Sequence, residues 1–197
     1  MEIASERGGV RCALHWVDGA ASGVVMVGGG DGGLEGPAEA LYPTLGEDLA
    51  GLEIATLRVD FRVHQFPGDV EEGVADVLAG VRYLIEQGIE RVGVLGHSFG
   101  GAVVIEAAAE EPLIRSVVTL ATQTAGAQRV GEIAPLLLVH GLDDVRLSPD
   151  CSRMLHRMAG EPKQLVLLEG ATHSLRQRRE DVRELVRGWY VETLGSR

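Results

Sequence analysis

Near its middle the chain carries Gly96-His97-Ser98-Phe99-Gly100-Gly101, and this stretch indicates both a fold class and a kind of site. It follows the apolar run Val92–Leu95, typical of a buried strand, and leads directly into the helix-favouring run Ala102–Ala109. A strand, a G-x-S-x-G turn and a helix in this order hold the serine in a strained backbone conformation with its hydroxyl exposed. Only glycine leaves room for the neighbouring backbones at the two flanking positions. Because the amide of Phe99 then lies at a helix N-terminus, where negative charge is stabilised, the turn predicts a reactive serine beside an anion-binding amide.

Short apolar runs alternate with helical patterns along the rest of the chain. This indicates an α/β protein with a mostly parallel central sheet and helices on both faces. The strands that we expect are Val10–Trp16, Val24–Val27, Ile54–Val59, Val92–Leu95, Val117–Leu120, Leu136–Val139 and Leu165–Leu168. The first two flank the turn-rich segment Asp18–Gly23, which indicates an antiparallel strand at the beginning of the sheet. No linker or repeat divides the chain, so residues 1–197 are expected to form a single domain.

Apolar residues at helical spacing predict one helix over residues 70–85, which ends at Gly88, and another at the end of the chain. The apolar face of the last helix consists of Val182, Leu185, Val186 and Trp189. Its arginines alternate with acidic residues, which favours an ion-paired, solvated face over an anion site.

Two further helices have less regular patterns. Ser148-Pro149 predicts the start of one, because serine caps helices and proline is tolerated at the first helical position. In that helix Met154, Leu155 and Met158 are expected to face inward. Residues 38–52 predict a weaker helix, since a proline and a glycine interrupt it.

Charge and composition argue against several classes of partner. A formal charge of −11 and a pI of about 5.0 repel phosphate backbones and anionic lipids, and 4% aromatic residues leave few rings for stacking on bases. We therefore expect neither nucleic acid nor membrane as a partner. No apolar run approaches the ~20 residues that span a bilayer, and Met1–Arg7 lacks the features of a secretory signal, so a cytoplasmic location is expected. Cys12 and Cys151 stand alone without disulfide or metal spacing, so both are expected to be reduced.

A second glycine-rich stretch offers an alternative site. Gly28-Gly29-Gly30-Asp31-Gly32-Gly33 follows the strand Val24–Val27 and contains G-x-G-x-x-G, and Asp60 closes the next strand. Dinucleotide-binding proteins place glycines against a pyrophosphate and an acid against a ribose in this way. Here the acid lies later than the usual ~20 residues, and the following helix is interrupted by Pro43. Dinucleotide binding is therefore the weaker hypothesis.

A serine nucleophile needs a base and an acid that orients the base. On a sheet of this kind they follow in the order serine, acid, histidine, each just after a strand. The strand Leu136–Val139 runs into Asp143 and Asp144, and the last strand runs into His173. The order and positions predict Ser98 as the nucleophile and His173 as the base, with either carboxylate able to orient it.

The other histidines are expected to serve elsewhere. His97 is next to the serine, and a neighbour in so tight a turn points in a different direction. The remaining ones are expected to be structural or solvated, with His64 within reach of the mouth of the site. These are His15, His64, His140 and His156.

Together these motifs resemble the α/β-hydrolase superfamily, and in particular its small, lidless members similar to dienelactone hydrolases. The resemblance is carried by the serine turn, by His140-Gly141-Leu142-Asp143-Asp144 and by Gly170-Ala171-Thr172-His173, and it extends from Val10 to Trp189. It implies the α/β-hydrolase fold. The short gap from Thr122 to Pro135, where lids are commonly inserted, implies that no lid domain is present.

The resemblance also implies roles for individual residues. The family's acid stands four residues after the histidine of the His-Gly pair, with an apolar residue three further on, which selects Asp144, followed by Leu147. An oxyanion hole in this family is made of the amide after the nucleophile and one from the loop after the early parallel strand. These are the amides of Phe99 and Gly30, with Asp31 as the alternative to Gly30.

The activity implied is that of a serine hydrolase, which cleaves small carboxylic esters, thioesters or lactones through an acyl-enzyme on Ser98. Dienelactone hydrolases use cysteine at this position, so their lactone activity does not transfer. Acyl transfer needs no cofactor, and the histidines and acids lack metal-ligand spacing, so no metal is expected. Without a lid the site is expected to be open and shallow, with kcat/KM falling as the acyl chain lengthens beyond a few carbons.

Two other classes of function stay open at this stage: a non-catalytic or regulatory binding protein with the same fold, and dinucleotide binding through Gly28–Gly33. The oligomeric state is also open, because the sheet edge near Val10–Trp16 is either exposed or paired across a dimer.

Overall fold

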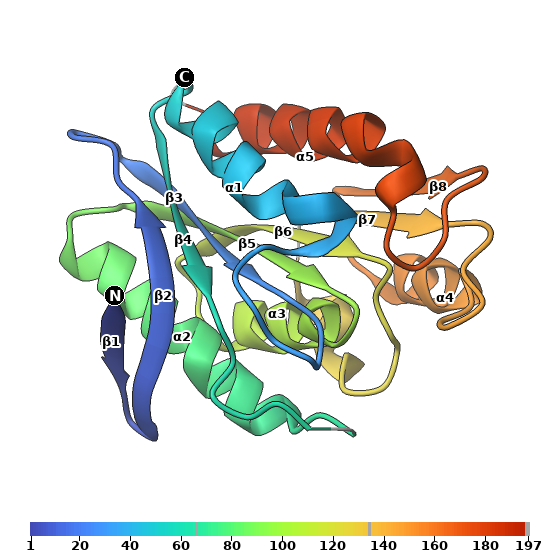
Figure 1. Cartoon of the computed structure of the whole chain (residues 1–197), viewed down its shortest axis with the longest axis horizontal. Helices are drawn as coiled ribbons and strands as arrows, with labels where there is room; N and C mark the ends of the chain where they lie inside the picture. Colours follow the sequence, from blue (N-terminus) through green and yellow to red (C-terminus); the bar gives the residue numbers. More distant parts are fainter. Residues whose placement is uncertain (66, 134, 196–197) are drawn as a thin grey trace.

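A computed structural model describes residues 1–65, 67–133 and 135–195, and its centre is a sheet between two layers of helices (Figure 1). The strands lie in the order β1-β2-β4-β3-β5-β6-β7-β8. Their bounds are β1 Glu2–Ser5, β2 Gly8–His15, β3 Ser22–Val27, β4 Ile54–Val59, β5 Arg91–His97, β6 Ile114–Leu120, β7 Leu136–Gly141 and β8 Lys163–Leu168. Strands β3 to β8 are parallel, whereas β2 is antiparallel to both β1 and β4. The predicted mostly parallel sheet with an antiparallel N-terminal strand is confirmed.

The N-terminal strands have neighbours that the sequence did not predict. Strand β2 pairs with β4, with Cys12 opposite Val59, because both sides of β3 are already taken by the parallel strands β4 and β5. The segment Asp18–Gly23 therefore does not close a hairpin between β2 and β3. Strand β1, which no pattern indicated, pairs with residues 8–11 of β2. It covers part of the edge that was expected to be exposed or paired in a dimer.

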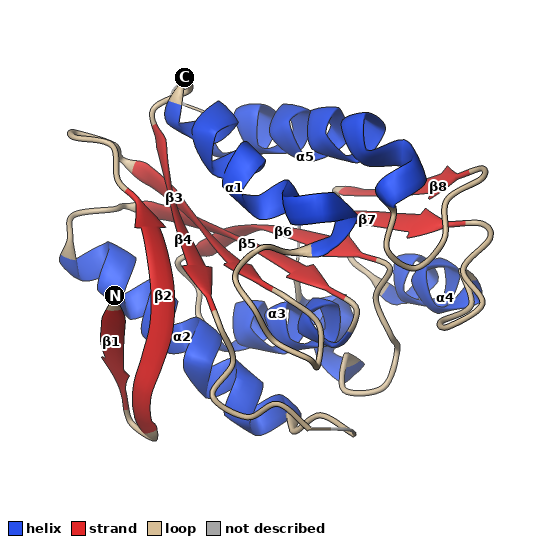
Figure 2. Cartoon of the chain, viewed as in Figure 1, coloured by secondary structure: helices blue, strands red, loops and turns tan. Residues whose placement is uncertain are grey.

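The helices form one layer on each face of the sheet. Helices α1 (Pro37–Ala50) and α5 (Arg179–Leu194) cover one face, and α2 (Val70–Glu86), α3 (Phe99–Glu110) and α4 (Asp150–Met158) cover the other (Figure 2). Each layer buries its own apolar cluster against the sheet. Every residue of β3 and β7 is buried, because both faces of these strands are covered. This is why they read as continuous apolar runs.

Helix α2 begins and ends where the sequence predicted. The Asp69 carboxylate accepts a hydrogen bond from the Glu72 amide at 3.2 Å and caps its first turn. Gly88 lies just beyond its end with φ 98°, a conformation that glycine adopts without strain.

The predicted inward face of α4 is partly wrong. Leu155 is buried at 1% exposure, but Met154 and Met158 are each 47% exposed. The helix lies over the outer strands β7 and β8, so only the stripe formed by Ser152, Leu155 and Ala159 reaches the core. The two methionines are four residues apart and share the opposite, solvent-facing side.

Helices α1 and α5 pack against each other. The apolar face of α5 is confirmed, with Leu185 half-buried and Val182, Val186 and Trp189 buried. Two of the arginines in this region pair with acids as predicted, since Arg183 contacts Asp48 of α1 and Glu180, and Arg178 contacts Asp181. Arg179 instead donates to the Thr44 hydroxyl. In α1, residues 38–40 are left-handed, so Pro43 lies in the first regular turn, where proline removes no helical hydrogen bond.

The connection from β6 to β7 contains a single 3₁₀ turn, η1 (Gln128–Glu132), and its described residues form no inserted lid. Within the described ranges, no helix has both the length and the apolar character needed to cross a membrane. Cys12 is buried and Cys151 is half-buried, and both thiols are free.

Candidate active site

Ser98 occupies a sharp turn between β5 and α3. Its backbone has φ 56° and ψ −116°, a combination that side-chain-bearing residues rarely adopt. Its amide donates to the Leu120 carbonyl at 2.9 Å, which ties the turn to the neighbouring strand. A Cβ at Gly96 would clash with the Gly100 carbonyl, and one at Gly100 would clash with the carbonyl of Gly28. The turn therefore requires glycine at both flanking positions, as the sequence indicated.

Three side chains from three loops meet at this turn. His173, in the loop after β8, lies with its Nε2 atom 3.0 Å from Ser98 Oγ. Its Nδ1 atom lies 2.7 Å from Oδ2 of Asp144, in the loop after β7. The carboxylate accepts the Nδ1 proton, so Nε2 is left to accept the serine hydroxyl proton. The structure thus joins in one hydrogen-bonded chain the three residues that the sequence singled out.

The Asp144 carboxylate is buried and held by several donors. Its Oδ1 atom accepts from the amides of Arg146 at 2.8 Å and Leu147 at 2.9 Å. Burial alone raises the pKa of Asp144, but the Leu147 amide, His173 and the Arg146 amide outweigh it, and the pKa is lowered. Asp144 is therefore ionised at neutral pH. Asp143 is exposed and contributes no side chain to this cluster.

Two histidines whose support of the site was not predicted hold the cluster from behind. His140 is fully buried, with Nδ1 2.7 Å from Ser152 Oγ and Nε2 3.2 Å from Asp144 Oδ2. His97 points away from the serine hydroxyl, as expected, and its Nε2 atom lies 3.1 Å from the His173 carbonyl. Burial lowers the pKa of both, to about 4 for His97, so both rings are neutral at pH 7. The only sequence signals were their positions beside Ser98 and four residues before the acid.

The glycine run after β3 lies over the serine. A Cβ at Gly29 would be 3.5 Å from the Ser98 Cβ, and one at Gly30 would be 4.0 Å from the Phe99 Cβ. The backbones of Gly30 and Phe99 therefore border the same space above the serine hydroxyl. Asp31 borders it too, so the structure leaves both candidates for the second amide at the site.

Two cavities border Ser98, and Gly30, Asp31 and Arg146 also border both of them. The smaller has a volume of about 240 Å³ and is bordered by Gly36, His173 and Ser174. The larger has a volume of about 720 Å³ and is bordered mainly by loops and by the first residues of α2 and α3. Ser98 thus borders two spaces of different volume.

The sequence profile of the Alpha/beta hydrolase family matches residues 24–143, which is more than half of the chain. The chain belongs to this family. The predicted resemblance is confirmed. A search of curated protein sequences gives no significant match.

Solved structures share the alpha/beta hydrolase fold over nearly the whole chain. Est1E from Butyrivibrio proteoclasticus is 21% identical, with a TM-score of 0.83 over 98% of each chain. A dienelactone hydrolase from Anabaena variabilis is 19% identical, with a TM-score of 0.84 over 98% of this chain and 96% of its own. XC6422 from Xanthomonas campestris, described as an α/β serine hydrolase without a lid, is 15% identical, with a TM-score of 0.77 over 100% of this chain and 95% of its own. At these identities the likeness establishes the fold.

The second glycine motif of this alpha/beta hydrolase is already engaged within the protein. Asp60, the acid that would hold a ribose, accepts a hydrogen bond from the Gly33 amide at 2.5 Å and pairs with Arg11. His64 also binds it, with Nε2 2.9 Å from Oδ1, and so is held at Asp60. The Asp60 carboxylate thus stabilises the glycine loop that covers Ser98.

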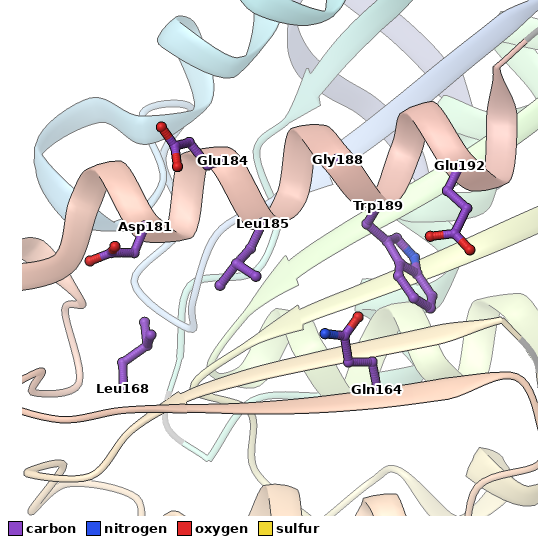
Figure 3. A pocket seen from close by; sticks show the side chains of 8 residues that line it. All are labelled: Gln164, Leu168, Asp181, Glu184, Leu185, Gly188, Trp189 and Glu192. Atoms are coloured by element: carbon purple, nitrogen blue, oxygen red, sulfur yellow. The ribbon is translucent and has the colours of Figure 1, made fainter.

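A third cavity, of about 520 Å³, lies between α5 and β8. In Figure 3, Leu185 and Trp189 extend from the helix toward Gln164 and Leu168 on the strand. Among the described residues, those bordering it include no serine, cysteine or histidine. It therefore lacks the groups that acyl transfer requires. The described part of the chain contains no cluster of three His, Cys, Asp or Glu residues suited to a metal ion.

Proposed function

We propose that this protein is a serine hydrolase that cleaves small carboxylic esters, thioesters or lactones through an acyl-enzyme on Ser98. The observation that carries the proposal is the continuous hydrogen-bonded chain from Ser98 through His173 to Asp144. At one end of this chain, Ser98 lies in a strained turn and borders two cavities. Such an arrangement activates a hydroxyl that is otherwise a weak nucleophile.

In the first half of the reaction, Ser98 Oγ attacks the carbonyl carbon and His173 Nε2 takes the hydroxyl proton. The ionised Asp144 stabilises the resulting imidazolium and keeps its ring oriented. The carbonyl oxygen becomes an oxyanion that accepts hydrogen bonds from the amides of Phe99 and Gly30. The bond to the leaving group then breaks, and the leaving oxygen or sulfur receives the proton from Nε2. Water repeats the same steps to release the acid and restore the serine.

The geometry favours turnover over a purely binding role. A non-glycine residue at the Ser98 backbone angles costs about 1 to 3 kcal/mol, and a binding protein has no use for that strain. The similar structures agree, since two are named as a dienelactone hydrolase and a serine hydrolase. Est1E has been solved with ferulic acid bound, which is an aromatic carboxylic acid. A small acyl compound therefore fits this acidic protein better than a nucleic acid does.

Intact-mass analysis after treatment with a fluorophosphonate tests the proposal directly. The parent protein is expected to gain one adduct and Ser98→Ala none, with both folded by circular dichroism. On short esters, Ser98→Ala is expected to lose about 10³-fold or more in kcat. An unlabelled but folded parent, or labelling that persists in Ser98→Ala, overturns the proposal. Saturable binding of NAD by the unlabelled protein would instead support the dinucleotide alternative.

A further inference from the structure

The two cavities at Ser98 differ in volume, and only one of them is bordered by His173. Among the described residues, His173 borders the cavity of about 240 Å³ and is absent from the wall of the one of about 720 Å³. Gly30 borders both, so the space for the oxyanion lies at their junction. A substrate carbonyl at Ser98 thus has one substituent on the side of His173 and the other in the larger cavity.

The proton transfers decide which substituent goes where. His173 Nε2 receives the serine proton when the Oγ–carbon bond forms, and it gives this proton to the leaving oxygen when the carbon–oxygen bond of the ester breaks. The leaving oxygen must therefore come within hydrogen-bond distance of Nε2, on the His173 side of the carbonyl carbon. The oxyanion points to the amides of Phe99 and Gly30. Only the larger cavity is then left for the acyl chain.

Building on the proposed function, we infer that the 720 Å³ cavity binds the acyl group and the 240 Å³ cavity binds the alcohol. The substrates are then esters of bulky, apolar or aromatic carboxylic acids with small alcohols. The threefold difference in volume sets the direction of this selectivity.

The walls of the cavities agree with this division. Val70, Leu147 and Phe99 are apolar residues that border the larger cavity. The Phe99 ring packs edge-on against Phe61 at a centroid distance of 5.4 Å, which fixes it as a rigid wall. The smaller cavity is bordered mainly by glycines, by His97 and His173 and by two serines, and the charged Asp31 and Arg146 border both cavities. Apolar acyl groups gain free energy from the first surface, and short polar alcohols fit the second.

This inference changes the expectation for acyl length. An open, shallow site predicts that any bulk lowers kcat/KM. With a large acyl cavity, bulk lowers kcat/KM only when it is on the alcohol, or when the acyl chain exceeds the cavity.

Two isomeric esters separate bulk on the acyl side from bulk on the alcohol side. Methyl phenylacetate carries its ring on the acid and benzyl acetate carries it on the alcohol, while mass and apolar surface are closely matched. We expect kcat/KM for methyl phenylacetate to exceed that for benzyl acetate by about tenfold or more, the discrimination that an apolar pocket commonly achieves. Acid release measured by titration at constant pH follows both substrates without a bulky chromogenic leaving group.

Ala125 provides a matched pair of variants at the larger cavity. It is exposed, borders that cavity and takes no part in the triad. Its hydrogen bond is made by its carbonyl, which accepts from the Gln123 side chain at 2.7 Å, so replacing the side chain leaves it in place. Ala125→Phe is expected to lower kcat/KM for methyl phenylacetate toward that for benzyl acetate, and to lower it by a larger factor than kcat/KM for methyl acetate, whose acyl group carries only a methyl. Ala125→Ser, which adds a single oxygen atom, should lower kcat/KM for methyl phenylacetate less than Ala125→Phe does.

The possible outcomes are distinct. Equal rates on the isomers, a preference for benzyl acetate, or a loss confined to benzyl acetate in Ala125→Phe overturns the cavity assignment. If Ser98 reacts with fluorophosphonate but the protein hydrolyses neither isomer, the proposed substrate class is wrong. A protein that is not labelled at Ser98 refutes the proposed function itself, so this failure is distinguishable from that of the cavity assignment.

Discussion

The strained backbone of Ser98 predicts that replacing the residue by glycine yields a more stable protein than replacing it by alanine. Both Ser98→Gly and Ser98→Ala remove the hydroxyl and its hydrogen bond to His173, so these losses are common to the two variants. They differ in the Cβ atom, which makes φ 56° with ψ −116° unfavourable for alanine and acceptable for glycine.

The magnitude follows from two opposing terms. Relief of the strained conformation is worth about 1 to 3 kcal/mol, and the greater freedom of glycine in the unfolded chain costs about 0.4 to 1 kcal/mol. The net expectation is that Ser98→Gly is more stable than Ser98→Ala by about 1 kcal/mol or slightly more. For a chain of this length, that corresponds to a rise of about 2 to 4 °C in Tm.

Urea unfolding followed by circular dichroism measures the difference, with thermal melting as a second observable. Gly188, inside α5, provides a control at which alanine rather than glycine is expected to be the more stable residue. A Cβ there meets nothing within 4 Å. Gly188→Ala is expected to stabilise the protein by about 0.5 to 1 kcal/mol, because glycine is unfavourable within a helix.

A result in which Ser98→Ala equals or exceeds Ser98→Gly in stability would refute the reasoning. It would mean that the turn stores no strain at Ser98. If Gly188→Ala leaves the free energy of unfolding unchanged, the control is uninformative and the comparison at Ser98 still stands.

Three further predictions concern the groups around the serine. Asp144→Asn is expected to lower kcat by about 10⁴-fold, because an amide does not hold the histidine in the productive tautomer. In steady-state assays on a short ester, the control Asp143→Asn, at an exposed carboxylate, should retain activity. Similar losses of kcat in the two variants would contradict the assignment of Asp144. Burial lowers the pKa of His97 from 6.5 to about 4, so between these pH values the unfolded chain binds more protons and the free energy of unfolding falls as the pH decreases. His97→Gln, which retains a donor, should reduce this loss by about 1 to 2 kcal/mol between pH 7 and pH 5 in urea unfolding, and an unaltered pH dependence would rule the effect out. Gly100→Ala forces a Cβ against the Gly28 carbonyl and is expected to cost about 1 to 3 kcal/mol and to abolish fluorophosphonate labelling, so a variant with the parent's Tm and labelling would disprove the clash.

The features that could be predicted are those that local chemistry specifies. The strand before Ser98, its flanking glycines and the helix after it form one continuous segment. The requirement for glycine at Gly96 acts within this segment, whereas the one at Gly100 also comes from the distant Gly28 carbonyl. We could predict that His173 and the two aspartates lie near Ser98, because each follows a strand and the carboxyl ends of parallel strands meet at one edge of a sheet. These local signals were sufficient to predict the fold, Ser98 and His173, whereas the choice of Asp144 over Asp143 rested on the family resemblance.

Features that depend on contacts between distant segments could not be predicted in this way. Periodicity shows that a strand or helix has an apolar face, but not which element covers it. The pairing of β2 with β4, the added strand β1 and the exposed side of α4 are therefore properties of the assembled fold. The same holds for His97 and His140, which have no distinguishing local pattern and are fixed by the atoms packed around them.

The chemistry of the site and its selectivity thus have different origins. A tight turn and the order of three residues are encoded along the chain, because backbone sterics and strand direction act locally. The two cavities that border Ser98 arise where loops from separate strands meet. Their sizes depend on packing among residues far apart in sequence, and only the folded chain brings those residues together.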